Sequence, residues 1–278
     1  MKLSVAISAY DAPPGAFVVW RGIQESICKA SQMGYDGVEL ALREAGEINP
    51  STLSRWLSDA HIQVSAISTG QVFAVSGLTF TDPTPDARTQ IRKTFFDLID
   101  LAADFAPIIN VGRARGSIQS GQTIREATEL FTQSIDPVLE YAAQKNVTII
   151  IEPVNRYEIN FVNNLDEGLD LLAAVKYANL GLMPDVFHMN IEDDYIGKSL
   201  IRAGSAVRYI HLADSNRLAP GQGHIDFDEV FSALSEIGFD GWASVEILPL
   251  PDPDTAAREA AAYLRPRIRA YRPKGGNV

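Results

Sequence analysis

Short runs of apolar, often β-branched residues alternate along the chain with longer segments whose apolar residues recur every three or four positions. The runs predict eight β-strands, at residues 3–7, 37–40, 64–68, 108–111, 148–151, 181–184, 207–210 and 242–245. A helix-length amphipathic segment follows each of them, and the clearest places Ile91, Phe95, Leu98 and Ala102 on one face. Strands that alternate with helices are typical of a parallel sheet built from βα units.

The number of units and the chain length together favour a closed sheet. Eight βα units in 278 residues, 46% of them hydrophobic, match one α/β domain of the (β/α)8 TIM barrel type. We predict that this single domain spans residues 1–272 and that residues 273–278 form a disordered tail. An open, doubly wound sheet is the alternative, but it predicts a glycine-rich phosphate turn after the first strand, and SAYDAPPG is not one.

Capping residues and loop lengths add local detail. Residues that start helices precede three of the amphipathic segments, namely Asn49, Asn164 and Asp226. The stretch from 69 to 86 is long for a βα loop, and we expect it to fold over the barrel mouth. The segment from 185 to 204 predicts only a short helix, with much of its length as loop.

Charge and cysteine content exclude several classes of protein. The net charge of −11 would repel phosphate backbones and anionic lipids, so we expect no nucleic-acid or membrane partner. The N-terminus does not have the pattern of a signal peptide and no apolar run reaches membrane-spanning length, which predicts a cytoplasmic protein. The single cysteine, Cys28, rules out a disulfide within the chain and is expected to be a small core residue.

Four successive predicted strands end at a residue that can bind a metal ion. These residues are Glu152, Asp185, His211 and Glu246, separated by about one βα unit each. In a TIM barrel the carboxyl ends of the strands meet at one mouth, so the four side chains are expected to converge. Each residue alone could instead cap a helix or fill the core, but unit spacing for all four favours a shared site.

Three carboxylates buried at one mouth require a compensating cation. Three oxygen ligands and one imidazole suit a hard to borderline divalent ion, so Mn²⁺ is our first choice, with Mg²⁺ and Co²⁺ as alternatives. Other polar residues fall in the same predicted loops, including Glu158, His188, Asn216 and Arg217, although Arg217 in a glycine-punctuated loop could also be an ordinary surface charge. His61 is predicted at the other end of the barrel, and His224 near the mouth.

The motifs around these residues resemble those of a known superfamily. EPVNRYE, DVFHMNIE, HLADSNRLAPGQGHIDF and GWASVE are similar to successive motifs of the xylose isomerase-like TIM barrels, in particular the ketose 3-epimerases of the D-tagatose and D-psicose type. GYDGVELALRE, STGQVFAVSGLTFTDP and NVGRARG resemble the subgroup that includes 5-keto-L-gluconate epimerase. The resemblance covers nearly the whole chain.

The resemblance implies roles for individual residues. It implies that Glu152, Asp185, His211 and Glu246 bind the metal, and that Glu152 and Glu246 are also the catalytic acid and base. It implies substrate binding by Glu158, His188 and Arg217, and a homo-oligomer, as relatives are commonly dimers or tetramers. Epimerases that take neutral sugars usually have a bulky aromatic residue where this chain has Arg113, Ala114 and Arg115.

An arginine at the mouth is a natural partner for a carboxylate or phosphate. We therefore assign Arg113, with Arg115 second, to an anionic substrate tail; the alternative is that either arginine pairs with a nearby acidic residue. The predicted function is a metal-dependent epimerase that inverts the carbon next to the ketone of a ketose or ketohexuronate, such as 5-keto-L-gluconate or D-tagaturonate, through an enediolate.

Other reactions remain open on the same barrel. An aldose–ketose isomerase of the hydroxypyruvate isomerase type would use the same enediolate, and a lyase such as dehydroshikimate dehydratase is a further alternative. A hydrolase of abasic DNA would need several metal ions, which four histidines and a charge of −11 disfavour. A non-catalytic sugar-binding barrel would have little reason to keep two glutamates on the metal.

Overall fold

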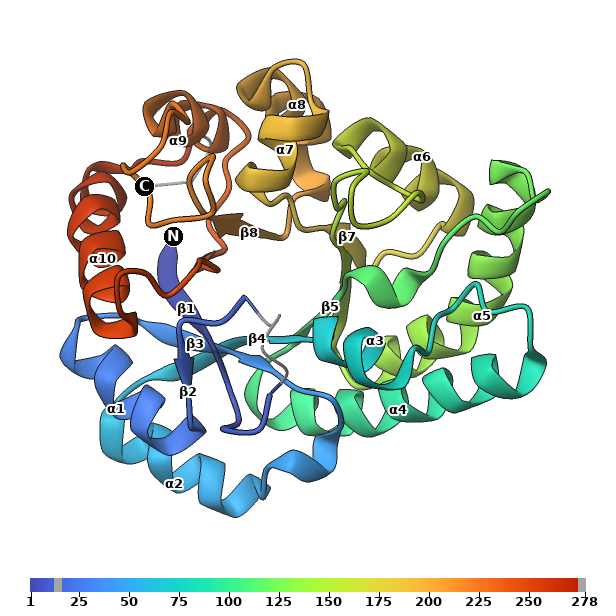
Figure 1. Cartoon of the computed structure of the whole chain (residues 1–278), viewed down its shortest axis with the longest axis horizontal. Helices are drawn as coiled ribbons and strands as arrows, with labels where there is room; N and C mark the ends of the chain where they lie inside the picture. Colours follow the sequence, from blue (N-terminus) through green and yellow to red (C-terminus); the bar gives the residue numbers. More distant parts are fainter. Residues whose placement is uncertain (13–16, 275–278) are drawn as a thin grey trace.

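The computed structural model describes residues 1–12 and 17–274, and its centre is a ring of eight parallel strands surrounded by helices (Figure 1). The predicted tail, residues 273–278, falls largely outside the described residues. A ninth, two-residue strand pairs with the first. The strands are β1 (Lys2–Ser8), β2 (Trp20–Arg21), β3 (Gly37–Ala41), β4 (Gln63–Ser68), β5 (Ile108–Val111), β6 (Thr148–Ile151), β7 (Leu180–Leu182), β8 (Tyr209–Leu212) and β9 (Trp242–Val245).

The strand order closes the sheet into a barrel. Neighbouring strands follow the order β7-β6-β5-β4-β3-β1-β9-β8, all in parallel register. Isolated parallel bridges, Leu182 with Val207 and Asp185 with His211, then join β7 to the β8 region. The (β/α)8 prediction is confirmed.

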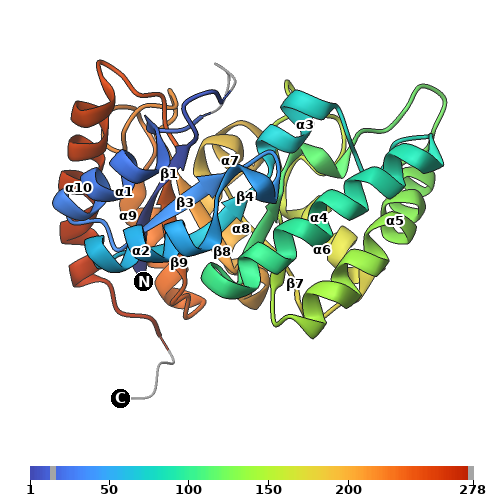
Figure 2. The same cartoon turned by 90° about the horizontal axis from the view of Figure 1, so that it is seen from below.

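Helices cover the outside of the barrel, as two perpendicular views show (Figures 1 and 2). The side chains of Asn49, Asn164 and Asp226 each accept a hydrogen bond from a main-chain N–H in the first turn, so all three predicted caps are confirmed. No helix in the described part of the chain has the length and apolar character needed to span a membrane. The helices are α1 (Ile23–Gln32), α2 (Pro50–Ala60), α3 (Gly70–Ser76), α4 (Pro85–Phe105), α5 (Ile124–Gln144), α6 (Leu165–Val175), α7 (Val186–Glu192), α8 (Ile196–Ala203), α9 (Phe227–Glu236) and α10 (Pro253–Ala270), with short 3₁₀ turns η1 (Ala45–Glu47), η2 (Arg113–Arg115) and η3 (Gly204–Ala206).

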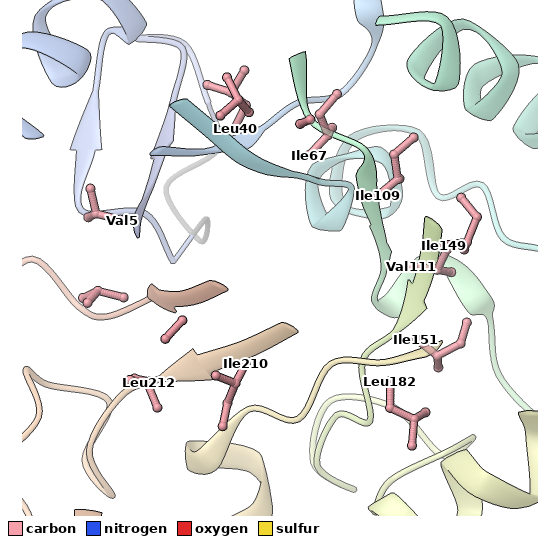
Figure 3. Close-up of a cluster of buried hydrophobic side chains, with 14 of the residues drawn as sticks. Val5, Leu40, Ile67, Ile109, Val111, Ile149, Ile151, Leu182, Ile210 and Leu212 are labelled. Carbon is pink, nitrogen blue, oxygen red and sulfur yellow. The ribbon is translucent and has the colours of Figure 1, made fainter. Parts of the chain in front are cut away.

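Alternation along the strands separates the apolar layer under the helices from the side chains that point into the barrel. On β8, Ile210 and Leu212 join the large hydrophobic cluster between strands and helices, whose strand side chains are drawn in Figure 3. Tyr209 and His211 alternate with them and point inward, where they meet Glu39 of β3. Since adjacent strand residues face opposite sides, each strand contributes to the core with one set of residues and to the interior with the other.

Three local predictions were wrong. Residues 70–76, expected as part of a long loop, form the helix α3, and the segment from 185 to 204 is mostly helical because α7 and α8 occupy it. Cys28 is exposed rather than buried. It follows Ile27, which lies on the buried stripe of α1, and one residue turns a helix by about 100°, which takes the thiol off that stripe.

The contact between α4, α5 and the β4–α4 connection provides a test of the core. Phe131 of α5 is fully buried and packs edge-to-face against Phe80 and Phe161, with ring centroids 5.9 and 6.1 Å apart. We expect Phe131→Ala to lower the free energy of unfolding by about 3–5 kcal/mol, because the cavity adds to the lost burial. Urea denaturation measures the effect. Ile124→Ala, on an exposed position of the same helix, should stay within about 0.5 kcal/mol of the parent, and an equal loss for both variants would contradict the packing argument.

Candidate metal centre

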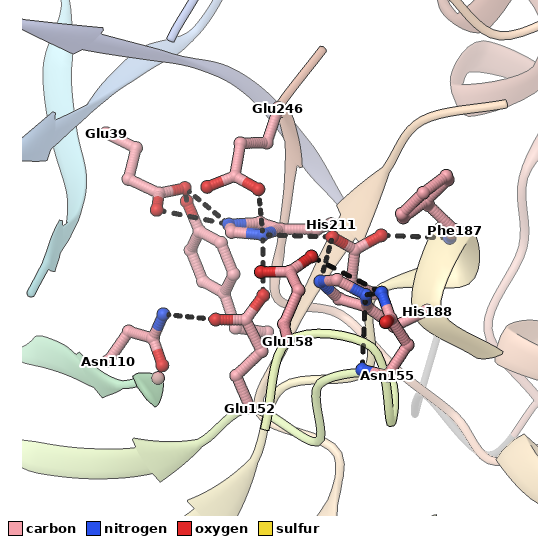
Figure 4. A network of polar contacts seen from close by, with 12 residues as sticks. Glu39, Asn110, Glu152, Asn155, Glu158, Phe187, His188, His211 and Glu246 are labelled. Atoms are coloured by element: carbon pink, nitrogen blue, oxygen red, sulfur yellow. Dashed lines mark hydrogen bonds and ion pairs between the residues drawn. The ribbon is translucent and has the colours of Figure 1, made fainter. Parts of the chain in front are cut away.

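The four residues predicted to bind metal come together at the carboxyl ends of the strands (Figure 4). Glu152 and Glu246 directly follow β6 and β9, Asp185 lies three residues beyond β7, and His211 is inside β8. One potential ligand atom from each residue lies within 4.8 Å of all the others. Asp185 and His211 are fully buried, and the two glutamates are largely buried.

The His211 ring occupies the centre of this group. Its Nδ1 atom lies 3.5 Å from a carboxylate oxygen of Glu246, 3.6 Å from one of Glu152 and 3.7 Å from one of Asp185, and it has no hydrogen-bond partner among the described residues. Its other nitrogen, Nε2, is hydrogen bonded to Glu39 at 2.9 Å. Because an ionised carboxylate only accepts hydrogen bonds, Nε2 donates to Glu39, and Nδ1 is the nitrogen that faces the three other carboxylates.

Glu39 is a part of the site that the sequence analysis missed. Its side chain is fully buried in the barrel interior and accepts a 2.9 Å hydrogen bond from the Tyr209 hydroxyl as well as the His211 bond. The hydroxyls of Ser4 and Ser65 contact the same Tyr209 oxygen at 3.1 and 2.7 Å. A carboxylate behind a histidine ligand fixes the tautomer of the ring and raises its basicity. The available signal was a charged residue at an inward position of the otherwise apolar strand GVELA.

The electrostatics of the group fit a divalent cation. Burial alone would lower the pKa of His211, but the surrounding carboxylates, first Glu39 and Glu246, outweigh it and raise the pKa well above its usual value. A positive charge at Nδ1 is therefore strongly favoured. A metal ion bound to Nδ1, Glu152, Asp185 and Glu246 would supply that charge, and the donor set of three carboxylates and one imidazole suits such an ion.

Arg217 supplies further positive charge at the same place. Its guanidinium donates to Asp185 Oδ2 at 2.7 Å and to Glu246 Oε2, and it lies between the rings of Phe17 and Phe187. Burial would raise the pKa of Asp185, but Arg217 reverses this effect and holds the pKa well below its usual range. The side chain is buried, so the surface-charge alternative for Arg217 is wrong.

Asp185 combines the two roles that the sequence left as alternatives. Its Oδ1 accepts a 2.9 Å hydrogen bond from the Phe187 N–H and so caps α7, while its Oδ2 faces Arg217 and His211. Glu152 is oriented from the other side by Asn110, whose Nδ2 donates to Glu152 Oε2 at 2.9 Å. Glu152 and Asp185 are thus each held through one oxygen, while the other oxygen faces His211.

Glu158 and His188 line the pocket above the metal group, and both contact Asn155 (Figure 4). Asn155 Nδ2 lies 2.7 Å from His188 Nδ1 and 3.3 Å from Glu158 Oε1. Burial lowers the pKa of His188 and favours the neutral ring. The pocket is also lined by α3, so the stretch from 69 to 86 does reach the barrel mouth, although as a helix.

The two arginines of η2 have different roles. Arg113 lines the pocket with its guanidinium over the Phe73 ring, and its Nη1 lies 3.8 Å from Glu158, which is beyond hydrogen-bond distance. Arg115 is fully buried and donates to the main-chain carbonyls of Gly112, Glu152, Phe161 and Val162. The assignment of Arg115 to a substrate tail was therefore wrong, because its donors are occupied by the backbone.

The remaining histidines lie outside the group. His61 follows α2 in a left-handed conformation and is exposed. His224 is exposed, and its Nδ1 contacts the Ser215 hydroxyl at 2.9 Å.

Comparison with known proteins places the chain in a family. The profile of the family described as xylose isomerase-like TIM barrel matches residues 27–267. An L-ribulose 3-epimerase of Methylomonas sp. is 31% identical over 239 residues, which cover 82% of this chain and 81% of that protein. The chain belongs to the xylose isomerase-like barrels, as a ketose 3-epimerase-like member.

Further relatives agree with this assignment. A D-psicose 3-epimerase of Ruminiclostridium cellulolyticum is 28% identical over 78% of the chain and 75% of its own length. The crystal structure of a D-psicose 3-epimerase with D-tagatose from Clostridium cellulolyticum H10 superposes with a TM-score of 0.82 over 98% of this chain and 100% of that one, at 24% identity, and so shares its fold. The protein is thus a sugar epimerase with a candidate divalent-metal site.

Glu39 provides a test of this candidate centre that needs no substrate. We expect Glu39→Gln to weaken Mn²⁺ binding by about 10- to 100-fold, since the amide can no longer hold the His211 ring as a carboxylate does. Isothermal titration calorimetry measures the affinity. Glu44→Gln, at an exposed position shortly after β3, is the matched control and should bind as the parent does. Unchanged affinity in Glu39→Gln would show that Glu39 does not support the site.

Proposed function

We propose that this protein is a divalent-metal-dependent epimerase that inverts the carbon next to the ketone of a ketohexuronate or related ketose with an anionic tail. The observation that carries the proposal is the pair Glu152 and Glu246, which approach the His211 ring from its two sides (Figure 4). Inversion of a carbon requires proton removal on one face and proton return on the other, and two opposed carboxylates suit both steps.

The residues that would hold the metal are Glu152, Asp185, His211 and Glu246, with Mn²⁺ as the first choice. A bound divalent ion supplies Lewis-acid polarisation of the ketone, which makes the neighbouring C–H more acidic. One glutamate then takes the proton of that C–H as a carboxylate, while the other, in its protonated form, donates a proton to the opposite face. Which of the two acts first depends on the epimer that binds.

Other pocket residues would orient the sugar. His188 and Arg217 lie beside the metal group and can donate to the oxygens of the reacting end, and Glu158 can accept from a hydroxyl. Asn110 holds Glu152 in a fixed orientation by its 2.9 Å hydrogen bond. Positioned groups of this kind lower the entropic cost of the reaction.

Arg113 supports the anionic tail. Two arginines line the pocket within the described parts of the chain, and Arg217 is bound to Asp185 and Glu246. Arg113 is partly exposed and only distantly paired with Glu158, so its donors can bind a substrate carboxylate. This favours a ketohexuronate such as 5-keto-L-gluconate or D-tagaturonate over a neutral ketose.

Proton exchange tests the two-glutamate mechanism. Ketohexuronates and ketoses are incubated with the Mn²⁺-loaded protein in D₂O, quenched with EDTA and examined by NMR; the parent should place deuterium at the inverted carbon. Glu152→Gln and Glu246→Gln should each lose epimerisation by about 10²–10⁴-fold. Each should still exchange the proton of one epimer, and the two variants should exchange different epimers.

The control for these variants is Glu236→Gln, at an exposed position at the end of α9, which should retain full activity. Metal content must be measured for every variant, because a glutamate that binds the metal can also lose activity by losing it. Retention of the original hydrogen at the inverted carbon would point to hydride transfer and would overturn the mechanism.

Arg113 tests the substrate class. Arg113→Gln should lower kcat/KM for a ketohexuronate by about 10- to 100-fold, the value of a charge-assisted hydrogen bond, and leave a neutral ketose unaffected. Arg125→Gln, on an exposed side chain of α5, is the matched control. An equal effect of Arg113→Gln on charged and neutral sugars would argue against the anionic tail.

A further inference from the structure

Asn155 contacts His188, which lines the pocket, and the function proposed above gives Asn155 no role. Asn155 is 3% exposed and belongs to the loop after β6, while His188 is 4% exposed and belongs to α7 (Figure 4). Two donors of Asn155 converge on one ring nitrogen of His188: the side-chain Nδ2 lies 2.7 Å from Nδ1 and the main-chain N lies 3.4 Å from it.

The orientation of the Asn155 amide is fixed by a second contact. Its Oδ1 accepts a 3.0 Å hydrogen bond from the Tyr157 N–H. If the amide were turned over, its NH₂ group would face this N–H, and the Tyr157 donor would lose its partner. Nδ2 therefore faces the ring, and it also donates to Glu158 Oε1 at 3.3 Å. Because an amide nitrogen only donates, His188 Nδ1 must be the acceptor.

A neutral imidazole that accepts at Nδ1 carries its proton at Nε2. His188 lines the pocket, and its Nε2 lies 3.9 Å from Asp185 Oδ2, which is too long for a hydrogen bond. The N–H at Nε2 therefore remains for an oxygen atom in the pocket. The opposite tautomer would present a lone pair there and repel a ketone oxygen, which can only accept.

We propose that Asn155 is a positioning residue that holds His188 as the Nε2–H tautomer, so that the ring donates a hydrogen bond to the oxygen of the reacting end of the sugar. The catalytic half of this inference rests on the proposed function, while the tautomer does not. Asn155 fixes which nitrogen of His188 carries the proton, and His188 donates that proton in a hydrogen bond to the sugar. A preorganised donor of this kind stabilises negative charge that develops on a ketone oxygen.

Asn155→Asp separates this role from a structural one. An aspartate oxygen can accept from the Tyr157 N–H as Asn155 Oδ1 does, so the local turn is kept. The atom that faces His188 becomes an acceptor instead of a donor, and Nδ1 must then carry a proton. If Asn155 served only the turn, this variant would behave as the parent does. Asn155→Ala removes the side-chain donor without adding charge and leaves only the distant main-chain N–H.

The tautomer can be read directly by long-range ¹H–¹⁵N NMR of the histidine rings, which distinguishes protonated from bare nitrogens. The chain has four histidines, and His188→Gln identifies the signal of His188. In the Mg²⁺-loaded protein without substrate, we expect a bare Nδ1 and a protonated Nε2 for His188. In Asn155→Asp we expect a protonated Nδ1 and a bare Nε2. A parent spectrum with a protonated Nδ1, or an unchanged tautomer in Asn155→Asp, would overturn the inference.

Kinetics test the consequence for catalysis. With the sugar identified by the D₂O screen, kcat should fall by about 10²-fold in Asn155→Asp, the typical effect of losing one such donor, and by less in Asn155→Ala. Mn²⁺ affinity should stay within about twofold in both, since the effect acts on His188 rather than on the metal group. Asn146→Asp, the same exchange at an exposed site after α5, should leave kcat unchanged.

Two outcomes would count against different parts of the inference. Full kcat in Asn155→Asp with an altered tautomer would contradict the catalytic role of the His188 hydrogen bond. Lack of turnover by the parent on every sugar would count against the proposed function alone.

Discussion

The buried negative charge at the barrel mouth is the constraint that the surrounding side chains satisfy. Glu39, Glu152, Asp185 and Glu246 surround one imidazole in a region with little access to solvent. Such a group is unfavourable unless positive charge compensates it. Arg217 contributes one positive charge and is bound to Asp185 and Glu246. The Nδ1 atom of His211 faces the three candidate metal ligands Glu152, Asp185 and Glu246. A cation at that nitrogen completes the balance.

The barrel interior provides the second layer of the same arrangement. Inward positions of the strands carry Tyr209, Ser4 and Ser65 behind Glu39, and this connected set reaches from the middle of the barrel to the His211 ring. Because adjacent strand residues face opposite sides of the sheet, these polar side chains take no position from the apolar layer under the helices. The site is therefore supported from below by side chains that never contact the pocket.

The fold and the convergence of the four central residues could be predicted from sequence, because the period of apolar residues and the spacing of strand-end ligands are both read along the chain. Glu39 could not, because its function depends on contact with β8, about 170 residues away. The helix α7 was underestimated for a related reason. His188 is buried on α7 but polar, at a position that an amphipathic pattern would make apolar.

Arg115 has a consequence for how this pocket can change over time. Its side chain holds η2 against the backbone of the β6–α6 loop through three carbonyl groups of that loop, two residues away from Arg113 at the pocket wall. The shape of the segment is therefore maintained by one arginine, and the chemistry it presents is set by another. If Arg113 binds the substrate as proposed, mutation at position 113 would alter which sugars are accepted while Arg115 keeps the turn intact, which would make this turn an evolvable position in the barrel.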